Sequence, residues 1–472
     1  MRCLKIVLLL AGLALLPAQV ILHGDGQLVQ VGDAFVDHDD AGWTIGNSVI
    51  RYSIGETGDG IGIRSIADPQ GRDWHRSTAS DNSVQINNQT VSIGSAATPF
   101  LDAEAGEWWG GVKLDVRYQL PSAGLEITRS YACYPGSSVI ETWTTFTVRG
   151  TRAVILSDLN DYAFSIQDGT LNWITGLNVP DEEGGPFSKL SGDLDDGQVF
   201  TLGSDTRASE TAMPWFSVRA PEGDEFFGSV LWSGSWRFRI ERHGDIDKLQ
   251  VGLPSFHTTL AAGAVLEAPH AIFGLTSAAV PDTSLALKNF IALGLRHGRP
   301  LHSYVTYNTW YSYGTFINQG SVAAEMDLAA AAGVEQFVID AGWWFHINPL
   351  DAGDFKKTWG SWLVDPERFP DGLGALSDHA HALGMRFGVW VEPERVDRAT
   401  VGLPGLARER FLATSGGRYN PNVPNAEADD AQVCLVDPEA RAWVMSKLVG
   451  FIEEARPDYL KWDNNFWLNC DR

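Results

Sequence analysis

The pattern of hydrophobic and polar residues changes once along the chain, near residue 282. Between residues 20 and 282, short runs alternate apolar and polar residues, and Gly, Asp, Asn and Pro separate the runs. Clear examples are residues 112–118, 139–148 and 226–240, and no helical stretch of comparable strength lies between them. Alternation with a period of two is typical of half-buried strands. Residues 20–282 are therefore predicted to form a large antiparallel β-sandwich.

After residue 282 the spacing becomes that of alternating helices and strands. Residues 284–295 have helical spacing, with Ser284 in position to cap the helix. The strand-like runs that follow are residues 304–310, 336–344, 386–394 and 458–465, and helical runs at 321–332, 373–383 and 438–455 separate them. This order predicts a parallel (β/α)8 barrel. The predicted fold is thus multidomain, β and then α/β, with residues 283–472 forming the first half of the barrel.

A half barrel has consequences for the rest of the fold. It leaves strand edges and an apolar interior face exposed, and a closed barrel has neither. We therefore expect the remaining strands to lie beyond Arg472, so that the barrel is truncated after its fourth strand.

Three of the strand-like runs end on a carboxylate beside an aromatic residue. They read Q-F-V-I-D-A-G-W-W at 336–344, R-F-G-V-W-V-E-P-E at 386–394 and D-Y-L-K-W-D-N-N at 458–465. Because chemistry in parallel barrels lies at the C-terminal strand ends, Asp340, Glu392 and Asp463 are expected to face one cleft. Tryptophan rings suit the apolar face of a pyranose, and carboxylates suit its hydroxyls. With 18 tryptophans in the chain, the pattern predicts sugar chemistry.

Asp463 is the best candidate for a nucleophile. Glycoside hydrolysis needs two carboxyl groups, one of them ionised. Lys461 lies two residues earlier on the same predicted strand, so both side chains point to one face, where the lysine cation would favour the ionised aspartate. The alternative interpretation is a structural ion pair at the rim of the barrel.

Charge and targeting signals narrow the possible partners. The net charge is -24, from 59 acidic and 35 basic residues, without a cluster of lysine and arginine. Nucleic acids and anionic membranes are therefore not expected partners. Residues 1–19 carry Arg2 and Lys5 before an apolar run at 6–16, the pattern of a secretory signal peptide. We expect export to the periplasm or the cell exterior.

Cysteines and histidines give only weak indications of disulfide bonds or of a metal site. Outside the signal segment the cysteines are Cys133, Cys434 and Cys470, an odd count that does not describe a disulfide scaffold. Buried thiols and a bridge between Cys434 and Cys470 both stay open. His379 and His381 lie on a predicted helix, where their spacing places the two rings on different faces, so they are interpreted as surface residues and not as metal ligands.

The chemistry-bearing runs resemble those of one enzyme family. K-W-D-N-N at 461–465 resembles the K-W-D-x-N nucleophile motif of glycoside hydrolase family 36, the α-galactosidase or melibiase family. F-V-I-D-A-G-W-W resembles its second-strand motif, F-G-V-W-V-E-P-E-R-V its third-strand motif, and Asn308-Thr309-Trp310 its first-strand N-x-W. Residues 232–236 and 214–216 resemble parts of the sandwich that precedes the barrel in that family.

The resemblance implies an exported retaining exo-glycosidase. It would hydrolyse terminal α-D-galactosyl residues of oligosaccharides or glycans by double displacement, with Asp463 as the nucleophile and without a metal or other cofactor. The residues expected to bind the terminal sugar are Asp340, Lys461, Trp390, Trp310 and Glu392. Glu392 and Glu394 match the third-strand motif either as sugar contacts or as supporting groups. The acid/base aspartate of the family lies two strands beyond the nucleophile, so it is expected beyond Arg472.

Ala341 departs from the family pattern. The family usually has two adjacent aspartates on the second strand, which bind the 4- and 6-hydroxyls of galactose, and here the pair is Asp340 and Ala341. The alternatives are therefore an α-N-acetylgalactosaminidase, a transglycosylase of the same fold, or a non-catalytic carbohydrate-binding protein. Assembly as a homo-oligomer is left open.

Overall fold

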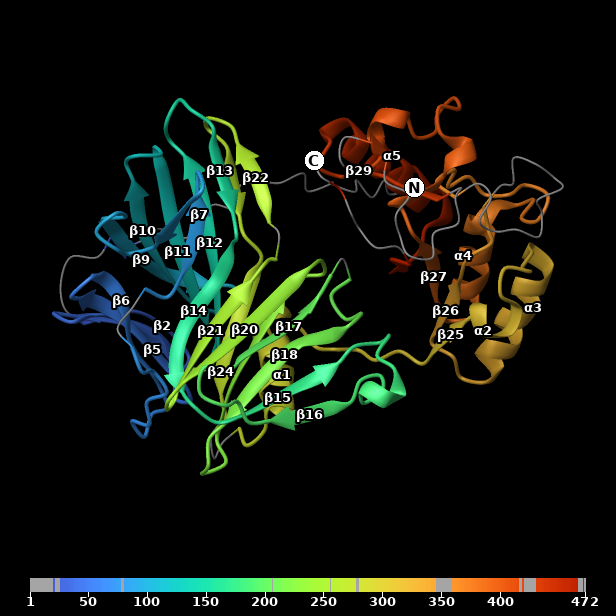
Figure 1. Cartoon of the computed structure of the whole chain (residues 1–472). Coiled ribbons are helices and arrows are strands. Elements are labelled where there is room, and N and C mark those ends of the chain that lie inside the picture. Colours follow the sequence, from blue (N-terminus) through green and yellow to red (C-terminus); the bar gives the residue numbers. More distant parts are fainter. Residues whose placement is uncertain are drawn as a thin grey trace. The chain divides into compact units, whose positions relative to one another are not determined.

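The computed structural model describes residues 20–21, 26–77, 80–205, 207–254, 256–276, 280–344, 359–415, 418–419, 430–465 and 470. The chain divides into two compact units, Met1–Leu301 and His302–Arg472, each of which is described by itself (Figure 1). The predicted signal segment, residues 1–19, lies outside the described residues.

The first unit is built on one large sheet. Its strands are β1 (Val20–Ile21), β9 (Phe100–Trp108), β10 (Gly111–Leu120), β11 (Leu125–Cys133), β12 (Val139–Val148), β15 (Thr170–Thr175), β16 (Lys189–Gly192), β18 (Ala212–Arg219), β19 (Glu225–Leu231), β23 (Val265–Glu267) and β24 (His270–Leu275). They run in the order β1-β9-β10-β11-β12-β24-β19-β18-β15-β16, and β23 pairs with β12.

Three smaller sheets complete the first unit. The first contains β2 (Gly26–Val31), β3 (Ala34–Asp39), β4 (Gly42–Gly46), β5 (Arg51–Thr57) and β6 (Gly60–Ala67) in chain order. The second has the order β22-β13-β7-β8 and contains β7 (Ser83–Ile86), β8 (Gln89–Ser92), β13 (Val154–Ser157) and β22 (His257–Leu260). The third has the order β14-β21-β20-β17 and contains β14 (Asn160–Gln167), β17 (Val199–Ser204), β20 (Trp236–His243) and β21 (Ile246–Gly252). A 3-10 helix, η1, spans Asp181–Glu183.

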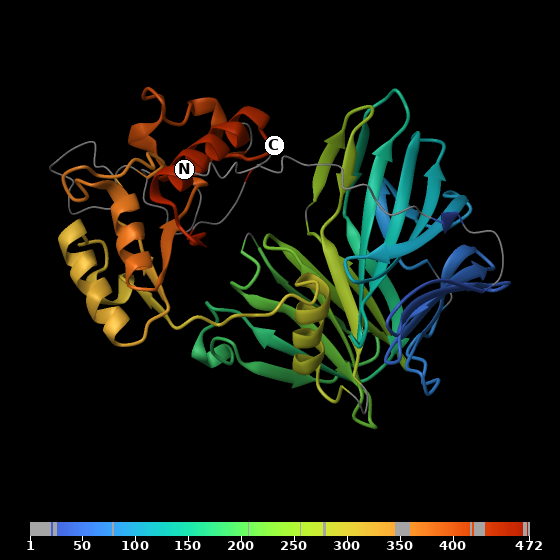
Figure 2. The same cartoon turned by 180° about the vertical axis from the view of Figure 1, so that it is seen from behind.

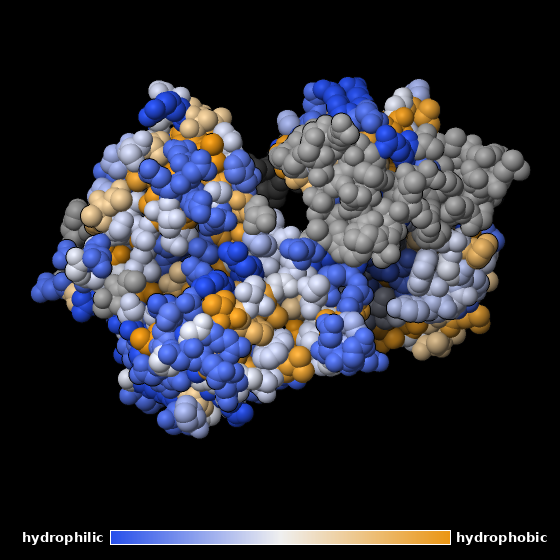
Figure 3. Space-filling view, viewed as in Figure 1, coloured by the Kyte–Doolittle hydropathy of each residue, from blue (hydrophilic) through white to orange (hydrophobic). Residues whose placement is uncertain are grey.

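The β-sandwich prediction is confirmed, and the alternating pattern explains the packing. All the described strand pairs of this unit are antiparallel. Along β20, every second residue is buried, as expected for a strand with one face on a core. The apolar faces meet in one large core, and Figure 3 shows that the visible outer face of this unit is mainly hydrophilic. The strand run predicted at 139–148 matches β12, and Gly58 and Asp59 form the hairpin turn between β5 and β6.

The helix predicted at 284–295 belongs to this first unit. It consists of α1 (Thr283–Phe290) and a π-helical turn, η2 (Ile291–Leu295), and Figure 2 shows it against the strands of the sandwich. Ala286 and Phe290 pack in a core shared with Tyr134 and Trp143. For that reason the compact units divide after Leu301, later than the boundary predicted at 282/283. The cap prediction was wrong: the N-cap is Asp282, whose carboxylate accepts the Leu285 N–H, and Ser284 only supports it.

The second unit contains a four-stranded parallel sheet with helices between its strands. In chain order the elements are β25 (Thr306–Asn308), α2 (Trp310–Tyr313), α3 (Gln319–Ala331), β26 (Gln336–Ile339), α4 (Gly372–Ala382), β27 (Arg386–Val391), α5 (Pro438–Ala455) and β32 (Tyr459–Trp462). The strand order is β25-β26-β27-β32, and the three pairings are parallel. The buried faces of α3, α4 and α5 share one core with the strands. This arrangement matches the predicted order of four strands with helices between them, and within the described residues the sheet stays open.

Short elements lie in the loop after β27. They are β28 (Arg395–Asp397), η4 (Arg398–Thr400), η5 (Glu409–Phe411), β29 (Thr414–Ser415), β30 (Arg418–Tyr419) and β31 (Asp430–Gln432). The first predicted strand, 304–310, is shorter in the structure, because the Asn308 side chain accepts the Trp310 N–H and turns the chain into α2. None of the described helices has the length and hydropathy needed to cross a bilayer.

Candidate active site

The C-terminal ends of the four parallel strands bring together most of the predicted site residues. Parallel pairing in register places the ends of all four strands at one edge of the sheet, where parallel barrels hold their chemistry. Asn308 ends β25, Asp340 follows β26, Trp390 and Glu392 lie at the end of β27, and Asp463 follows β32. Two hydrogen-bonded groups of side chains form at this edge.

The first group is centred on Asp463. One carboxylate oxygen, Oδ2, accepts the Trp390 indole N–H at 2.8 Å and the Asn465 side-chain amide at 2.8 Å. The other, Oδ1, accepts the Asn464 backbone N–H at 3.0 Å. Its backbone is fixed as well, because the Asp463 N–H donates to the Val391 carbonyl. Three donors thus converge on one half-buried carboxylate.

These donors determine the charge of Asp463. Burial is the largest single influence and raises the pKa of Asp463, while the hydrogen bonds from Trp390 and Asn465 lower it. Together with the Asn464 N–H and the Lys461 charge, they hold the pKa of Asp463 below its usual value. The carboxylate is therefore ionised at neutral pH and oriented, as a nucleophile requires. Lys461 contributes less to this ionisation than the sequence suggested, since hydrogen bonds from neighbouring residues dominate.

The second group is centred on Asp340, which is 2% exposed. The ammonium of Lys461 and the side-chain amide of Asn308 both donate to Asp340 Oδ2, each at 2.7 Å. The backbone N–H of Asp340 donates to the Thr309 hydroxyl at 2.9 Å. Lys461, in β32, therefore forms its ion pair with Asp340, which follows β26, and β27 lies between these two strands. This pair places a cation and a polar carboxylate beside the nucleophile candidate.

Glu392 follows β27 directly and is buried. It is 2% exposed, and its carboxylate accepts both the backbone N–H and the side-chain amide of Asn465. Burial raises the pKa of Glu392 to about 7, opposed by Arg395 at 3.6 Å and by the Asn465 bonds. Asn465 in turn donates to Asp463, so Glu392 acts on the nucleophile candidate through Asn465. Burial also raises the pKa of Glu394.

Tryptophans support the same edge. Trp390 is 2% exposed, stacks on Trp344 with ring centroids 5.5 Å apart, and its carbonyl accepts the Trp343 indole N–H at 3.0 Å. This packing fixes the indole that donates to Asp463. Trp310, in α2, is 41% exposed.

Residues 266–469 match the family model described as Melibiase. This part of the chain is therefore similar to the melibiase family. The chain is 28% identical over 282 residues to the alpha-galactosidase of Escherichia coli, and 26% identical over 259 residues to alpha-galactosidase 1 of Pediococcus pentosaceus. These matches cover 55% and 52% of this chain but 36% and 33% of the relatives. The chain thus spans about a third of the length of the curated relatives that it matches.

Solved structures share the fold. The GH36 alpha-galactosidase AgaB of Geobacillus stearothermophilus superposes with a TM-score of 0.70 at 18% identity, over 94% of this chain and 66% of that one. The alpha-galactosidase of Lactobacillus brevis superposes with a TM-score of 0.67 at 18% identity, over 96% of this chain and 65% of that one. The chain therefore shares its fold, a sandwich followed by parallel strands, with these two alpha-galactosidase structures.

The predicted site residues fall into three kinds. The structure places Asp463, Lys461 and Asp340 at the strand ends, where Lys461 binds Asp340 and Trp390 binds Asp463. Trp390 and Glu392 belong to the same network but are buried, so they support the site from beneath. Asn465 and Asn308 were not predicted as site residues, yet Asn465 binds the carboxylate of Asp463 and Asn308 binds that of Asp340. The signal that could have found them is their spacing: Asn465 lies two residues after Asp463, and Asn308 ends the neighbouring strand.

Other predictions for this unit concern metals and thiols. His379 Nε2 lies 2.9 Å from Asp327 and His381 Nε2 lies 2.7 Å from Asp458, so the two rings have separate partners. Over the described part of the chain, there is no group of three metal-ligating side chains. The Sγ atoms of Cys434 and Cys470 lie 3.1 Å apart.

Proposed function

We propose that Asp463 is the nucleophile of an exported retaining exo-glycosidase that removes terminal α-D-galactosyl residues from oligosaccharides or glycans. The carboxylate would attack the anomeric carbon and displace the aglycone, and water would then release the sugar from the covalent intermediate. The observation that carries this proposal is the convergence of Trp390, Asn465 and the Asn464 N–H on Asp463, which keeps the carboxylate ionised and oriented.

The neighbouring ion pair supports a sugar substrate. Lys461 is 36% exposed in its side chain, so its ammonium can donate to a hydroxyl while it stays bound to Asp340. An ammonium and a carboxylate side by side match the donor and acceptor of adjacent sugar hydroxyls. The exposed ring of Trp310 suits the apolar face of the same sugar. Structures of the related AgaA of Geobacillus stearothermophilus are described as complexes with stachyose and raffinose, both of which we propose as substrates.

A retaining mechanism also needs an acid/base carboxyl group. Asp340 is bound to Lys461 and Asn308, and Glu392 is bound to Asn465, so both carboxylates already have other roles. Neither is assigned as the acid/base. Export is part of the proposal on the basis of Arg2, Lys5 and the apolar run at 6–16.

A panel of aryl α-glycosides tests the proposal. Wild type should release the aryl group fastest from the α-galactoside, and Asp463→Asn should abolish turnover while circular dichroism and thermal unfolding stay unchanged, because only the reacting oxygen is lost. Asp458→Asn, on the N-terminal side of the same strand, is the matched control and should retain turnover. Turnover by Asp463→Asn near the wild-type level would remove Asp463 from the mechanism.

A further inference from the structure

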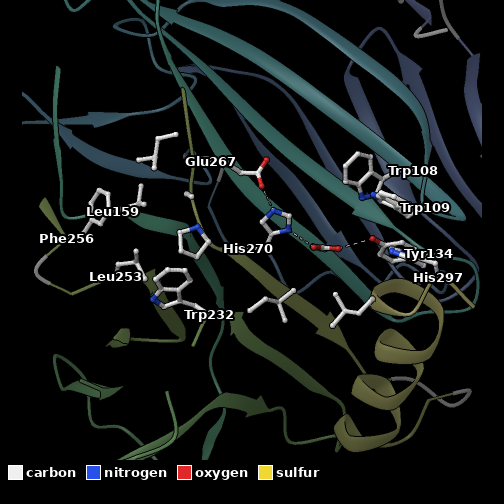
Figure 4. Close-up of a pocket in the computed structure, with 16 residues that line it drawn as sticks. Trp108, Trp109, Tyr134, Leu159, Trp232, Leu253, Phe256, Glu267, His270 and His297 are labelled. Carbon is white, nitrogen blue, oxygen red and sulfur yellow. Dashed lines mark hydrogen bonds and ion pairs between the residues drawn. The ribbon is translucent and has the colours of Figure 1, made fainter. Parts of the chain in front are cut away.

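A cavity of about 640 Å³ lies in the first unit. Its lining comes from the ends of β9, β12, β19, β23 and β24 and from the segment after η2. This volume is within the range of small-molecule sites, roughly 300–1,000 Å³. We call this cavity the sandwich pocket. Figure 4 shows His270 at its centre, with Trp108 and Trp109 on one side and Trp232 on the other.

The polar wall of the sandwich pocket is a fixed chain of hydrogen bonds. The Tyr134 hydroxyl donates to Glu141 at 2.9 Å, and the other Glu141 oxygen lies 2.6 Å from His270 Nδ1 (Figure 4). The His270 ring stacks on the buried Trp143, with centroids 4.2 Å apart and planes 3° from parallel. These contacts fix the imidazole so that Nε2 lies 3.4 Å from the carboxylate of Glu267. The Glu267 side chain is 62% exposed, so it can accept further hydrogen bonds.

The aromatic wall includes a residue held in an uncommon backbone conformation. Trp109 and Gly110 form the two-residue turn between β9 and β10, with φ of 46° and 83°. Such turns favour Asn-Gly, and a bulky residue there is an outlier. His297 also has a positive φ, 52°, and its ring stacks on Trp109 at 4.6 Å. Strained residues persist where surrounding structure holds them and often belong to binding sites.

Two large rings remain open to solvent at the pocket. Trp109 is 56% exposed and Trp232 is 44% exposed. A pyranose presents an apolar C–H face, which packs on such rings, and a rim of hydroxyls, which donate to carboxylates. Among the described residues that line the pocket there is no lysine or arginine, whereas Glu141 and Glu267 are both present. An anionic ligand is therefore disfavoured, and a neutral polyhydroxylated ring matches the set of acceptors.

We propose that the sandwich pocket is a second carbohydrate-binding site, which takes neutral hexose units of an oligosaccharide or polysaccharide. The ring of one unit lies on Trp232, and its hydroxyls bind Glu267 and His270 Nε2. None of its lining residues is among the strand-end residues of the second unit, and it would hold substrate to the protein without taking part in hydrolysis. The proposal does not depend on the role of Asp463.

Native affinity electrophoresis in gels that contain galactomannan tests the proposal. All variants carry Asp463→Asn, so that the polymer is not degraded during the run. Trp232→Ala and Glu267→Gln should each weaken retardation about tenfold or more in dissociation constant, the typical cost of losing a central contact. Phe187 is an aromatic residue outside the pocket that is 55% exposed, and Phe187→Ala should leave retardation unchanged. Thermal unfolding confirms that each variant is folded.

Two further measurements distinguish the sandwich pocket from a sugar site in the second unit and from a contact between copies of this chain. Trp310→Ala removes an exposed ring from the second unit, so retardation that persists in this variant while it is lost in Trp232→Ala supports the sandwich pocket. Unchanged retardation in both pocket variants would overturn the proposal. It would also be overturned if Trp232→Ala changed the sedimentation coefficient of the sugar-free protein, because the pocket would then be an interface between copies.

Discussion

Glu392 offers a test of how Asp463, the proposed nucleophile, is held in place. In the structure its carboxylate accepts two hydrogen bonds from Asn465, which donates to Asp463. Because burial raises the pKa of Glu392 to about 7, it is protonated at pH 5.5 and ionised at pH 8.5. Glu392→Gln resembles the protonated acid in shape and charge. The substitution should therefore matter at high pH and have little effect at low pH.

The size of the effect of Glu392→Gln follows from the hydrogen bonds with Asn465 that the substitution changes. At pH 8.5 the variant loses a charged acceptor, and its amide places a donor opposite the donors of Asn465. A hydrogen bond to a charged group is worth about 1.5–3 kcal/mol, which corresponds to a factor of roughly 10 to 150. If that free energy holds Asn465 against Asp463, covalent labelling by an activated fluorogalactosyl fluoride should slow by about tenfold or more at pH 8.5. At pH 5.5 the two proteins should be labelled at similar rates.

Stability gives an independent readout with a defined sign. The folded-state pKa of Glu392 is raised from 4.5 to about 7, so the folded protein keeps a proton that the unfolded chain releases. The resulting stability is fully present below pH 4.5 and is lost as the pH rises through 7, a change of roughly 3 kcal/mol. The Glu392→Gln variant should not lose this stability as the pH rises. Glu453→Gln, the same change on the exposed face of α5, should lose it as the wild type does. The reasoning would be refuted if the difference between wild type and Glu392→Gln, in labelling rate and in free energy of unfolding, were the same at both pH values.

Three other substitutions test separate parts of the structure. Lys461→Ala leaves the buried Asp340 without its cation, so the free energy of unfolding should fall by about 1–3 kcal/mol in denaturant titrations, and an unchanged value would show that the pair is not stabilising. Ala341→Asp should increase the preference for an α-galactoside over its 6-deoxy analogue, measured as a ratio of kcat/KM, because a charged acceptor is added beside Asp340. Burial raises the pKa of Asp161 to about 8, and its two carboxylate oxygens have no hydrogen-bond partner among the described residues. The stability that this proton contributes is lost as the pH rises from about 4 to 8, so Asp161→Asn should flatten the pH dependence of unfolding, and an unaltered slope would contradict the shift.

Local patterns in the sequence were sufficient for the architecture. The alternation at 139–148 predicted β12, and the helical spacing at 438–455 predicted α5, because each pattern depends only on which face of an element is buried. The rule that parallel strands place chemistry at their C-terminal ends was sufficient to bring Asp340 and Asp463 to one edge. Both inferences use only the spacing of residues along the sequence and do not require knowing which residues pack against one another.

The details that were missed depend on contacts between distant segments. Lys461 was expected to act on Asp463, but the parallel sheet places it within 2.7 Å of Asp340, which lies 121 residues earlier. Trp390 was expected to contact sugar, and packing on Trp344 instead buries it beneath Asp463. The sandwich pocket combines residues from five strands, so no single stretch of sequence shows it. Pairing and burial of this kind are properties of the folded chain.

The most direct test of the account is the position of the covalent sugar. A fluorogalactosyl fluoride carries its own leaving group, so it labels a nucleophile without assistance from a general acid. The protein is incubated with this reagent, its intact mass is measured, and the labelled peptide is sequenced by mass spectrometry. The account predicts a single added fluorogalactosyl group on Asp463 and none in Asp463→Asn. A label on Asp340 or Glu394, or an unlabelled wild-type protein, would contradict it.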